Sequence, residues 1–306
     1  MNIGLMYGMT LQPGQDSLEA WLAYAKMTEE MGFRSLWLPN IMSWDAMSAL
    51  AAAGGVTERI ELGTAVMPTY PRHPVAMAQQ ALSTGTITGD RFTLGIGLSH
   101  KIMIEDMMGM SYEKPAKHMK EYLEVLSPLL KREPVGHKGD LYRVHAGLDV
   151  PGSGEVPLLV AALGEIMLGH AGRLSAGTIT WMTGIKTLAG HIVPKIQKSA
   201  SDAGKASPRV VGGFPLVVTD DQEGARSLMS KVYRMYGALP SYRAMLDREG
   251  AAGPEDIALV GNEAELTAEL GRLRDAGVTD LKVAVTPVEE GSEQRTLDFL
   301  ASESTS

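Results

Sequence analysis

Short apolar stretches alternate with amphipathic stretches along most of the chain. The first pair consists of the apolar run 3–8 and a following segment in which Leu18, Trp21, Leu22 and Ala25 recur at helical spacing. An apolar run of this length, followed by one apolar face repeating every three to four residues, indicates a strand and then a helix.

The same alternation predicts eight strands and eight helices. The predicted strands are 3–8, 34–39, 60–67, 91–98, 156–163, 177–182, 210–219 and 280–286. The predicted helices are one between Asp16 and Gly32, then 45–54, 74–84, 115–130, 165–174, 188–203, 222–236 and 263–276. Strands separated by helices pair in parallel, so the pattern predicts an α/β protein with a (β/α)₈ TIM barrel. An open, doubly wound sheet is the alternative fold.

Acidic or amide side chains followed three residues later by glutamate indicate where several helices begin. The three pairs are Asp16 with Glu19, Asp220 with Glu223, and Asn262 with Glu265.

Three stretches interrupt the repeat: 100–114 after the fourth strand, 133–155 before the fifth, and 241–256 before the last helix. The middle stretch contains PVGHKGDLYRV, which has the pattern of a polar hairpin. No long polar linker divides the chain. We therefore predict a single domain over 1–306, with insertions after strand four and before strand five, and a disordered tail at 302–306.

Composition narrows the class of protein. With 44% apolar residues the chain can build a large core, and a net charge of −8 argues against a nucleic-acid binder. Cysteine is absent, which excludes disulfides and thiolate chemistry. No signal peptide or membrane-length apolar run is visible, so the expectation is a cytoplasmic protein that acts on a small molecule, without nucleic-acid or membrane partners.

Familiar catalytic motifs are missing. The sequence contains no HExxH, GxSxG or P-loop pattern, and its seven histidines do not have metal-ligand spacing, so no metal site is expected. The Gly95-Ile96-Gly97 segment lacks the third glycine of a dinucleotide fingerprint.

In a (β/α)₈ barrel the functional groups lie at the carboxyl ends of the strands and in the loops that follow them. The candidate residues at these ends are Asn40, Trp44, Ala65, Val66, Met67, Thr69, Leu98, Ser99, His100, Ala161, Ala162, Leu163, Gly164, Trp181, Met182, Thr183 and Gly184.

Three segments carry a resemblance to a known superfamily. They are ELGTAVMPTYPRHP with the following VAMAQQALS, then GDRFTLGIGLSH, and finally WMTG together with LPSYRAMLDREG. Over nearly its whole length the chain resembles the luciferase-like superfamily of (β/α)₈ oxidoreductases. WMTG and LPSYRAMLDREG resemble a branch whose members are usually assigned the deazaflavin coenzyme F420, and relatives that use FMN share the same frame.

The resemblance implies a role for the end of the third strand. Superfamily members have a non-prolyl cis peptide there, which maps onto Ala65-Val66, and the resulting bulge supports the middle ring of the flavin or deazaflavin. Without the resemblance, a trans peptide between two small apolar residues would be the expectation.

His100 follows strand four directly, where relatives place an acid or polar group near the reactive ring. A histidine can exchange a proton at neutral pH, which suits a hydride transfer coupled to proton transfer. An exposed loop histidine is the alternative. Asn40 departs from the pattern of the deazaflavin dehydrogenases, many of which have an acidic residue and a histidine after strand two. Trp44 either borders the ring or covers the start of the next helix.

The segments after strands five and six are candidates for holding the cofactor phosphate. Leu163-Gly164 opens directly into a helix, whose free N–H groups attract anions, and Thr183-Gly184 adds a hydroxyl. An ordinary glycine turn is the alternative. Lys114, Lys117 and Lys120, with Lys101 nearby, are either a solvated face or a weak indication of a site for the anionic coenzyme tail.

Three functional hypotheses follow from the resemblance. The first is an F420-dependent oxidoreductase that moves a hydride between deazaflavin C5 and a small organic substrate by C=C, C=N or C=O chemistry. The second is an FMN-dependent monooxygenase, and the third is a non-catalytic flavin-binding barrel. Homodimers are common in the superfamily, so a homodimer is consistent with the resemblance.

Overall fold

The computed structural model describes residues 1–8 and 16–305, and Ser306 of the predicted tail lies outside the described residues. Contacts divide the chain into two compact units. The first unit comprises Met1–Trp37, Ile179–Lys195 and Arg209–Ser306, and the second comprises Leu38–Thr178 and Ile196–Pro208. Each unit contains parallel strands alternating with helices, whereas a single domain over the whole chain stays a prediction.

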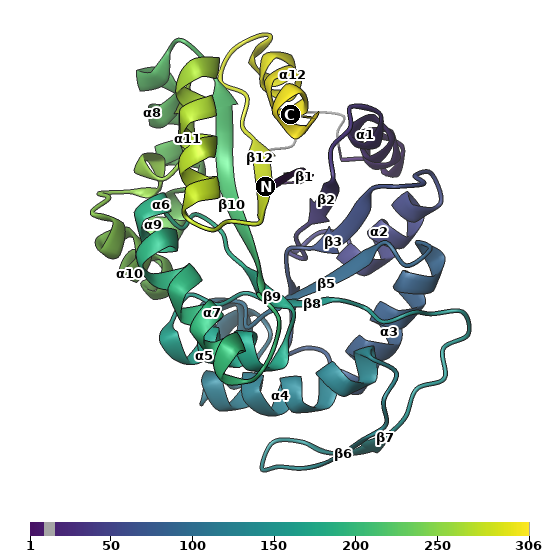
Figure 1. Cartoon of the computed structure of the whole chain (residues 1–306). Helices are drawn as coiled ribbons and strands as arrows, with labels where there is room; N and C mark the ends of the chain where they lie inside the picture. Colours follow the sequence, from purple (N-terminus) through teal and green to yellow (C-terminus); the bar gives the residue numbers. More distant parts are fainter. Residues whose placement is uncertain (9–15, 306) are drawn as a thin grey trace. The chain divides into compact units, whose positions relative to one another are not determined.

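The first unit has five parallel strands in the order β11-β10-β12-β1-β2. These strands are β1 (Asn2–Met6), β2 (Ser35–Leu38, with Leu38 counted in the second unit), β10 (Arg209–Val218), β11 (Leu259–Gly261) and β12 (Asp280–Val285). The helices are α1 (Leu18–Glu30), α6 (Ile185–Thr187), η2 (Leu188–Ile192), α8 (Gln222–Val232), α9 (Arg234–Ala238), α10 (Pro240–Glu249), η3 (Pro254–Asp256), α11 (Glu263–Asp275) and α12 (Ser292–Thr305). In Figure 1, α11 and α12 lie beside the long strand β10.

The second unit has its parallel strands in the order β3-β5-β8-β9, with β4 paired to β5. These strands are β3 (Glu61–Thr64), β4 (Met67–Pro68), β5 (Phe92–Gly97), β8 (Leu158–Val160) and β9 (Gly177–Ile179, with Ile179 counted in the first unit). The helices are α2 (Ala46–Gly54), α3 (Pro74–Ile87), η1 (Met103–Met107), α4 (Pro115–Leu130), α5 (Glu165–Leu174) and most of α7 (Val193–Asp202).

The strands are buried along most of their length. All six residues of β5 and nine of the ten in β10 are buried. Burial on both faces is characteristic of parallel strands covered by helices, and it explains why these segments read as continuous apolar runs instead of alternating ones.

The hairpin that the sequence predicts before strand five forms as β6 (Val135–Lys138) paired antiparallel with β7 (Arg143–Ala146). It extends from the second unit next to α4 (Figure 1). The predicted insertion after strand four contains the short π-helical turn η1 and leads into α4.

Helix starts follow the capping residues, with two corrections. Asn262 caps α11 in a full capping box with Glu265, as predicted. The cap of α1 is Ser17, whose hydroxyl accepts from the N–H of Ala20, not Asp16. The cap of α8 is Asp221, not Asp220. In both cases the capping residue lies one position later than predicted, because its side chain accepts from the N–H group three residues ahead.

Other differences concern short elements and the carboxyl end. The predicted strand 177–182 ends at Ile179, and the segment 241–256, predicted to be irregular, includes most of α10. The predicted tail is also wrong from 302 to 305, since these residues are the last turn of α12. That helix buries Leu297, Phe299 and Leu300. This tertiary packing stabilises the helix as far as its polar last residues.

Candidate active site

The third strand is interrupted where it passes β5. Gly63 is level with Thr93, and pairing resumes with Met67 level with Ile96. Three residues of one strand therefore lie opposite two of the other, which is the count of a β-bulge. The Thr64 hydroxyl compensates for the lost backbone pairing, since it accepts from the Gly95 N–H and donates to the Gly95 carbonyl, each at 2.8 Å.

The peptide between Ala65 and Val66 is cis, so the expected non-prolyl cis bond is confirmed. Val66 is half-buried and lies over the two glycines of β5. A Cβ on Gly97 would come within 2.7 Å of Val66 Cγ2, and one on Gly95 within 2.1 Å of the Thr64 carbonyl oxygen. The Gly-Ile-Gly segment, which resembled part of a dinucleotide fingerprint, makes room for the bulge instead.

The strand β5 leads through Leu98, Ser99 and His100, all three half-buried, into a helical turn. Ser99 has φ 60°, a left-handed conformation that is uncommon for a residue other than glycine and concentrates at functional sites. The His100 carbonyl accepts from the N–H groups of Met103 and Ile104, which fixes the turn. Burial lowers the pKa of the His100 imidazole, so the ring is mostly neutral at pH 7.

Asn40 has a partner within the protein. Its side-chain oxygen accepts from the Ala46 N–H at 2.9 Å, which closes the loop before α2. Asp45 caps α2 and pairs with Arg72 and Gln80. This part of the loop is therefore held to the segment after β4. Trp44, directly before Asp45 in the sequence, is half-buried.

The segment after β8 leads into α5 as predicted. Ala161 is tied to β5 through its N–H, which donates to the Ile96 carbonyl at 2.8 Å, and Ala162 is buried. Gly164 is the exposed N-cap of α5 and has no side chain to cap the helix, while Leu163 beside it is half-buried. The helix α5 is ten residues long, and its exposed start has no side-chain cap, so its first backbone N–H groups can bind an anion.

The residues Trp181, Met182, Thr183 and Gly184 lie in the first unit and are all buried, and Met182 has φ 47°. The helix start that follows is already paired within the protein. The Glu249 carboxylate of α10 accepts from the N–H groups of Lys186 and Thr187 and from the Thr187 hydroxyl. A carboxylate therefore lies where the sequence suggested a contribution to phosphate binding.

The lysines considered for the coenzyme tail are largely paired with acidic side chains. Lys117 pairs with Asp140, Lys120 with Glu124 at 3.2 Å and Lys101 with Glu105 at 3.5 Å. These pairs favour a solvated, self-compensated face.

Two groups of polar side chains that are buried in part or in full were missed from the sequence. The first, which we call the tyrosine–histidine cluster, lies in the second unit around the segment after β4. It consists of Thr69, Tyr70, Tyr112, His118 and Tyr142. Thr69, predicted to bind cofactor, is fully buried, and its hydroxyl is 2.9 Å from His118 Nε2. Met67 before it is also fully buried.

The second, which we call the lysine site, lies in the first unit. Lys282 of β12 is 2% exposed, and its Nζ lies 5.4 Å from the centre of the Trp181 ring. Its neighbours in register on both sides, Gly4 and Gly213, lack side chains and leave room for it. Burial lowers the pKa of Lys282 to about 7. A lysine within the apolar run DLKVAV was the available signal.

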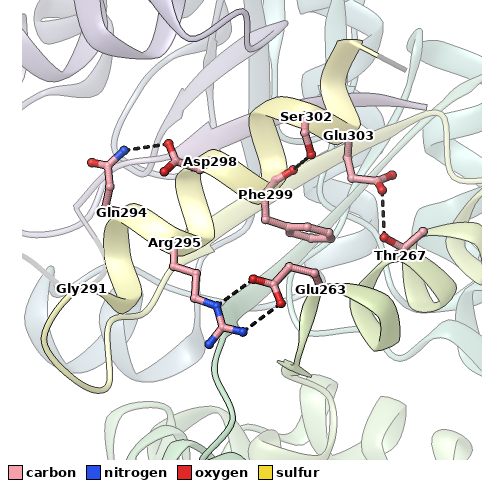
Figure 2. A pocket seen from close by; sticks show the side chains of 9 residues that line it. All are labelled: Glu263, Thr267, Gly291, Gln294, Arg295, Asp298, Phe299, Ser302 and Glu303. Carbon is pink, nitrogen blue, oxygen red and sulfur yellow. Dashed lines mark hydrogen bonds and ion pairs between the residues drawn. The ribbon is translucent and has the colours of Figure 1, made fainter.

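A groove between α11 and α12 is lined by charged residues that pair with one another (Figure 2). Arg295 pairs with Glu263 and Asp220, and Glu303 accepts from the Thr267 hydroxyl. None of the predicted site residues lines this groove. Its charges are satisfied internally, so it offers no free group for chemistry.

Over residues 1–8 and 16–305, no group of three or more His, Cys, Asp or Glu side chains is placed to hold a metal ion. In the same part of the chain, no helix combines the length and apolar character needed to cross a membrane.

Comparison with known proteins identifies relatives along most of the chain. The sequence is 27% identical to a 5,10-methylenetetrahydromethanopterin reductase of Methanolobus tindarius over 278 residues, which is 90% of this chain and 84% of the relative. It is 30% identical to an F420-dependent glucose-6-phosphate dehydrogenase of Intrasporangium calvum over 218 residues, covering 65% of each chain.

The fold matches that of a solved relative. The coenzyme F420-dependent tetrahydromethanopterin reductase of Methanopyrus kandleri superposes with a TM-score of 0.81 at 22% identity, covering 99% of this chain and 97% of that one. The predicted TIM barrel is therefore confirmed. The family model described as luciferase-like monooxygenase matches residues 3–280. The chain thus belongs to the luciferase-like monooxygenase family and is an oxidoreductase with a (β/α)₈ barrel.

Proposed function

We propose that this protein is a coenzyme F420-dependent oxidoreductase that reduces or oxidises a small organic molecule. The observation that carries the proposal is the bulge at the end of β3, where Val66 lies over Gly95 and Gly97. This arrangement presents a small apolar surface at a strand end, which suits the face of a flat tricyclic ring. The relative from Intrasporangium calvum, whose name includes F420, supports deazaflavin over flavin.

The residues described above fit such a coenzyme. Ala65 and Val66 would support the ring, and the uncapped start of α5 at Gly164 would bind its phosphate. When bound, the coenzyme supplies a hydride at C5. We assign Leu98, Ser99, Ala161 and Ala162 to the walls of the same site. In the first unit, Trp181, Met182 and Thr183 stay predicted cofactor-binding residues. Gly184 is a weaker candidate, because Glu249 pairs with the N–H groups that follow it.

His100 is the proposed proton-transfer residue. Because burial keeps its imidazole mostly neutral at pH 7, the ring can accept a proton or donate through its one N–H. Asn40 is assigned to loop closure by its bond to Ala46, and Trp44 to the edge of the site.

An FMN-dependent monooxygenase is the second candidate, supported by the description of the matching family. Titration of the purified protein with F420 and with FMN, followed by fluorescence quenching, separates the two. We expect tighter binding of F420. Binding of neither compound at micromolar concentration would contradict both candidates.

Turnover separates an enzyme from a non-catalytic flavin-binding barrel. We expect the protein to oxidise reduced F420 in the presence of some member of a panel of enones and imines. The His100→Ala variant should lower kcat about 100-fold and leave the affinity for F420 nearly unchanged, since general acid–base groups contribute roughly 10²–10⁴-fold. His145→Ala, in the exposed β7 strand, is the control and should behave as wild type. Equal turnover in both variants would remove His100 from the mechanism.

A cytoplasmic location and a homodimer remain part of the proposal. Gel filtration with light scattering tests the second.

A further inference from the structure

Tyr70, immediately after Thr69, lies in a stack of three rings. Its ring is nearly parallel to His118, at 2° with 4.0 Å between the ring centres, and is stacked on Tyr112 at 27° and 5.2 Å. A ring held on both sides by other rings has few rotamers available. The position of the Tyr70 phenol is therefore set by its neighbours.

One side of the stack is fixed by hydrogen bonds. His118 is 6% exposed, with Nε2 at 2.9 Å from the Thr69 hydroxyl and Nδ1 at 3.5 Å from the Tyr142 hydroxyl. Burial lowers the pKa of His118 to about 4, so the imidazole is neutral at pH 7. Both of its ring nitrogens are engaged within the protein.

The other side of the stack is tied to the turn that carries His100. The Tyr112 hydroxyl donates to the Ser99 carbonyl at 3.3 Å. Tyr70, in the segment after β4, is thus connected through Tyr112 to the segment after β5. These two strand ends carry most of the proposed site in the second unit.

The hydroxyl of Tyr70 differs from those around it. It is buried and has no hydrogen-bond partner among the residues that the structure describes. By contrast, the Tyr122 hydroxyl in the same region donates to the Arg72 carbonyl at 2.9 Å. Buried polar groups are almost always paired, and an unpaired one costs stability, so such a group requires an explanation.

The surroundings of this hydroxyl determine what it can bind. Burial, together with Tyr112, Tyr142 and Glu105, raises the pKa of Tyr70, so the phenol keeps its proton and acts as a donor. The nearby imidazole of His118 is neutral, Glu105 is acidic, and Arg72 is paired with Asp45. A phosphate would meet an acidic side chain and an arginine that is already paired, whereas a flat, uncharged ring with carbonyl oxygens would meet an aromatic stack and one donor.

We propose that the Tyr70 phenol donates a hydrogen bond to a carbonyl oxygen of the bound coenzyme ring. Both deazaflavin and flavin present carbonyl oxygens on the pyrimidine part of the ring, so the inference holds for either coenzyme. It rests on the proposed function in one respect, namely that a ring of this class binds to this protein.

The experiment compares Tyr70→Phe with Tyr122→Phe, which each remove one hydroxyl from the same region. Urea unfolding of both variants is measured without coenzyme. Tyr70→Phe should leave the unfolding equilibrium constant unchanged or slightly more favourable to the folded state, because no protein hydrogen bond is lost. Tyr122→Phe should shift it about tenfold toward the unfolded state, as expected for one buried hydrogen bond. An equal loss in both variants would show that Tyr70 has a protein partner and would overturn the proposal.

The affinity for F420 and FMN is then measured by fluorescence quenching, with the absorption spectrum of the bound coenzyme as a second readout. Tyr70→Phe should bind the preferred coenzyme about tenfold more weakly and shift its absorption maximum, whereas Tyr122→Phe should match the wild type in both. Unchanged coenzyme affinity and an unchanged spectrum in Tyr70→Phe would overturn the proposal. If, in addition, only turnover with the enone cyclohexenone falls, the proposal is also overturned, and the phenol is assigned as a donor to the substrate. If the wild type binds neither coenzyme, both the proposed function and this inference fail, whereas wild-type binding with no change in Tyr70→Phe defeats this inference alone.

Discussion

The tyrosine–histidine cluster of the second unit and the lysine site of the first solve the burial of polar groups in different ways. In the cluster, Thr69, His118 and Tyr142 pair with one another, and a single hydroxyl is left over. In the lysine site, Lys282 has no hydrogen bond or ion pair among the described residues and is stabilised by burial of its alkyl chain and by the Trp181 ring. A buried polar group that is hydrogen-bonded within the protein needs no ligand to account for its burial. An unpaired one is costly and indicates a site where something else binds or reacts.

The largest expected effect comes from Lys282→Met, which replaces the amine by an apolar side chain of similar length. The folded-state pKa of about 7 lies below the ordinary 10.5, so the unfolded chain binds more protons between these values. Wild-type stability therefore falls as the pH drops from 10.5 to 7 and then stays level. We expect the variant to be more stable by about 4 kcal/mol at pH 7.

Urea unfolding at pH 7 and pH 9.5 measures this difference, which should shrink at the higher pH. An equal difference at both pH values would mean that Lys282 keeps an ordinary pKa and has an acceptor. The contrast between the two clusters would then be lost. A more stable variant with lower turnover would place Lys282 among the functional residues of the first unit.

The second prediction concerns the glycines that make room for the bulge. In Gly95→Ala the new Cβ would lie 2.1 Å from the Thr64 carbonyl oxygen, a backbone atom that cannot move without disrupting the bulge. We expect a loss of about 3 kcal/mol, the upper range for overpacking. Gly271→Ala in α11, where a Cβ meets nothing within 4 Å, is the control and should be neutral or stabilising. Thermal unfolding of both variants tests this, and a stable Gly95→Ala protein would show that the bulge is adaptable.

Periodicity predicted many of the elements and favoured the barrel over an open, doubly wound sheet, because apolar burial determines where strands and helices form. The helices 115–130 and 165–174 match α4 and α5 to the residue. The cap of α1 at Ser17 was missed because two adjacent residues can both cap, and only the backbone geometry decides. The helix α12 was missed because its order comes from tertiary packing of Leu297 and Leu300, which composition does not reveal.

The candidate site also contains features that could be predicted from the sequence and others that could not. The strand ends were predicted from the barrel pattern. Their cis peptide was predicted only from a resemblance, because the local sequence Ala65-Val66 contains nothing that demands it. The partners of Thr69 and Thr187 could not be predicted. His118 lies 49 residues from Thr69, and Glu249 lies 62 residues from Thr187. Such pairings depend on how distant helices pack, and short-range patterns carry no information about them.

The smallest expected effect concerns the pH dependence of the tyrosine–histidine cluster. The folded-state pKa of His118, about 4, lies below the ordinary 6.5, so the unfolded chain again binds more protons, here between pH 6.5 and pH 4. Stability should fall by about 2 kcal/mol between pH 7.5 and pH 5. The His118→Gln variant cannot titrate and should lose this part of the slope while Lys282→Met keeps it. Protonation of His118 and of Lys282 lowers the stability of the folded protein in two separate pH ranges. Urea unfolding of the two variants across pH 4.5 to 10 therefore shows which residue causes the loss of stability in each range. A slope that survives in His118→Gln would place the titrating group elsewhere and leave the neutral, paired imidazole unsupported.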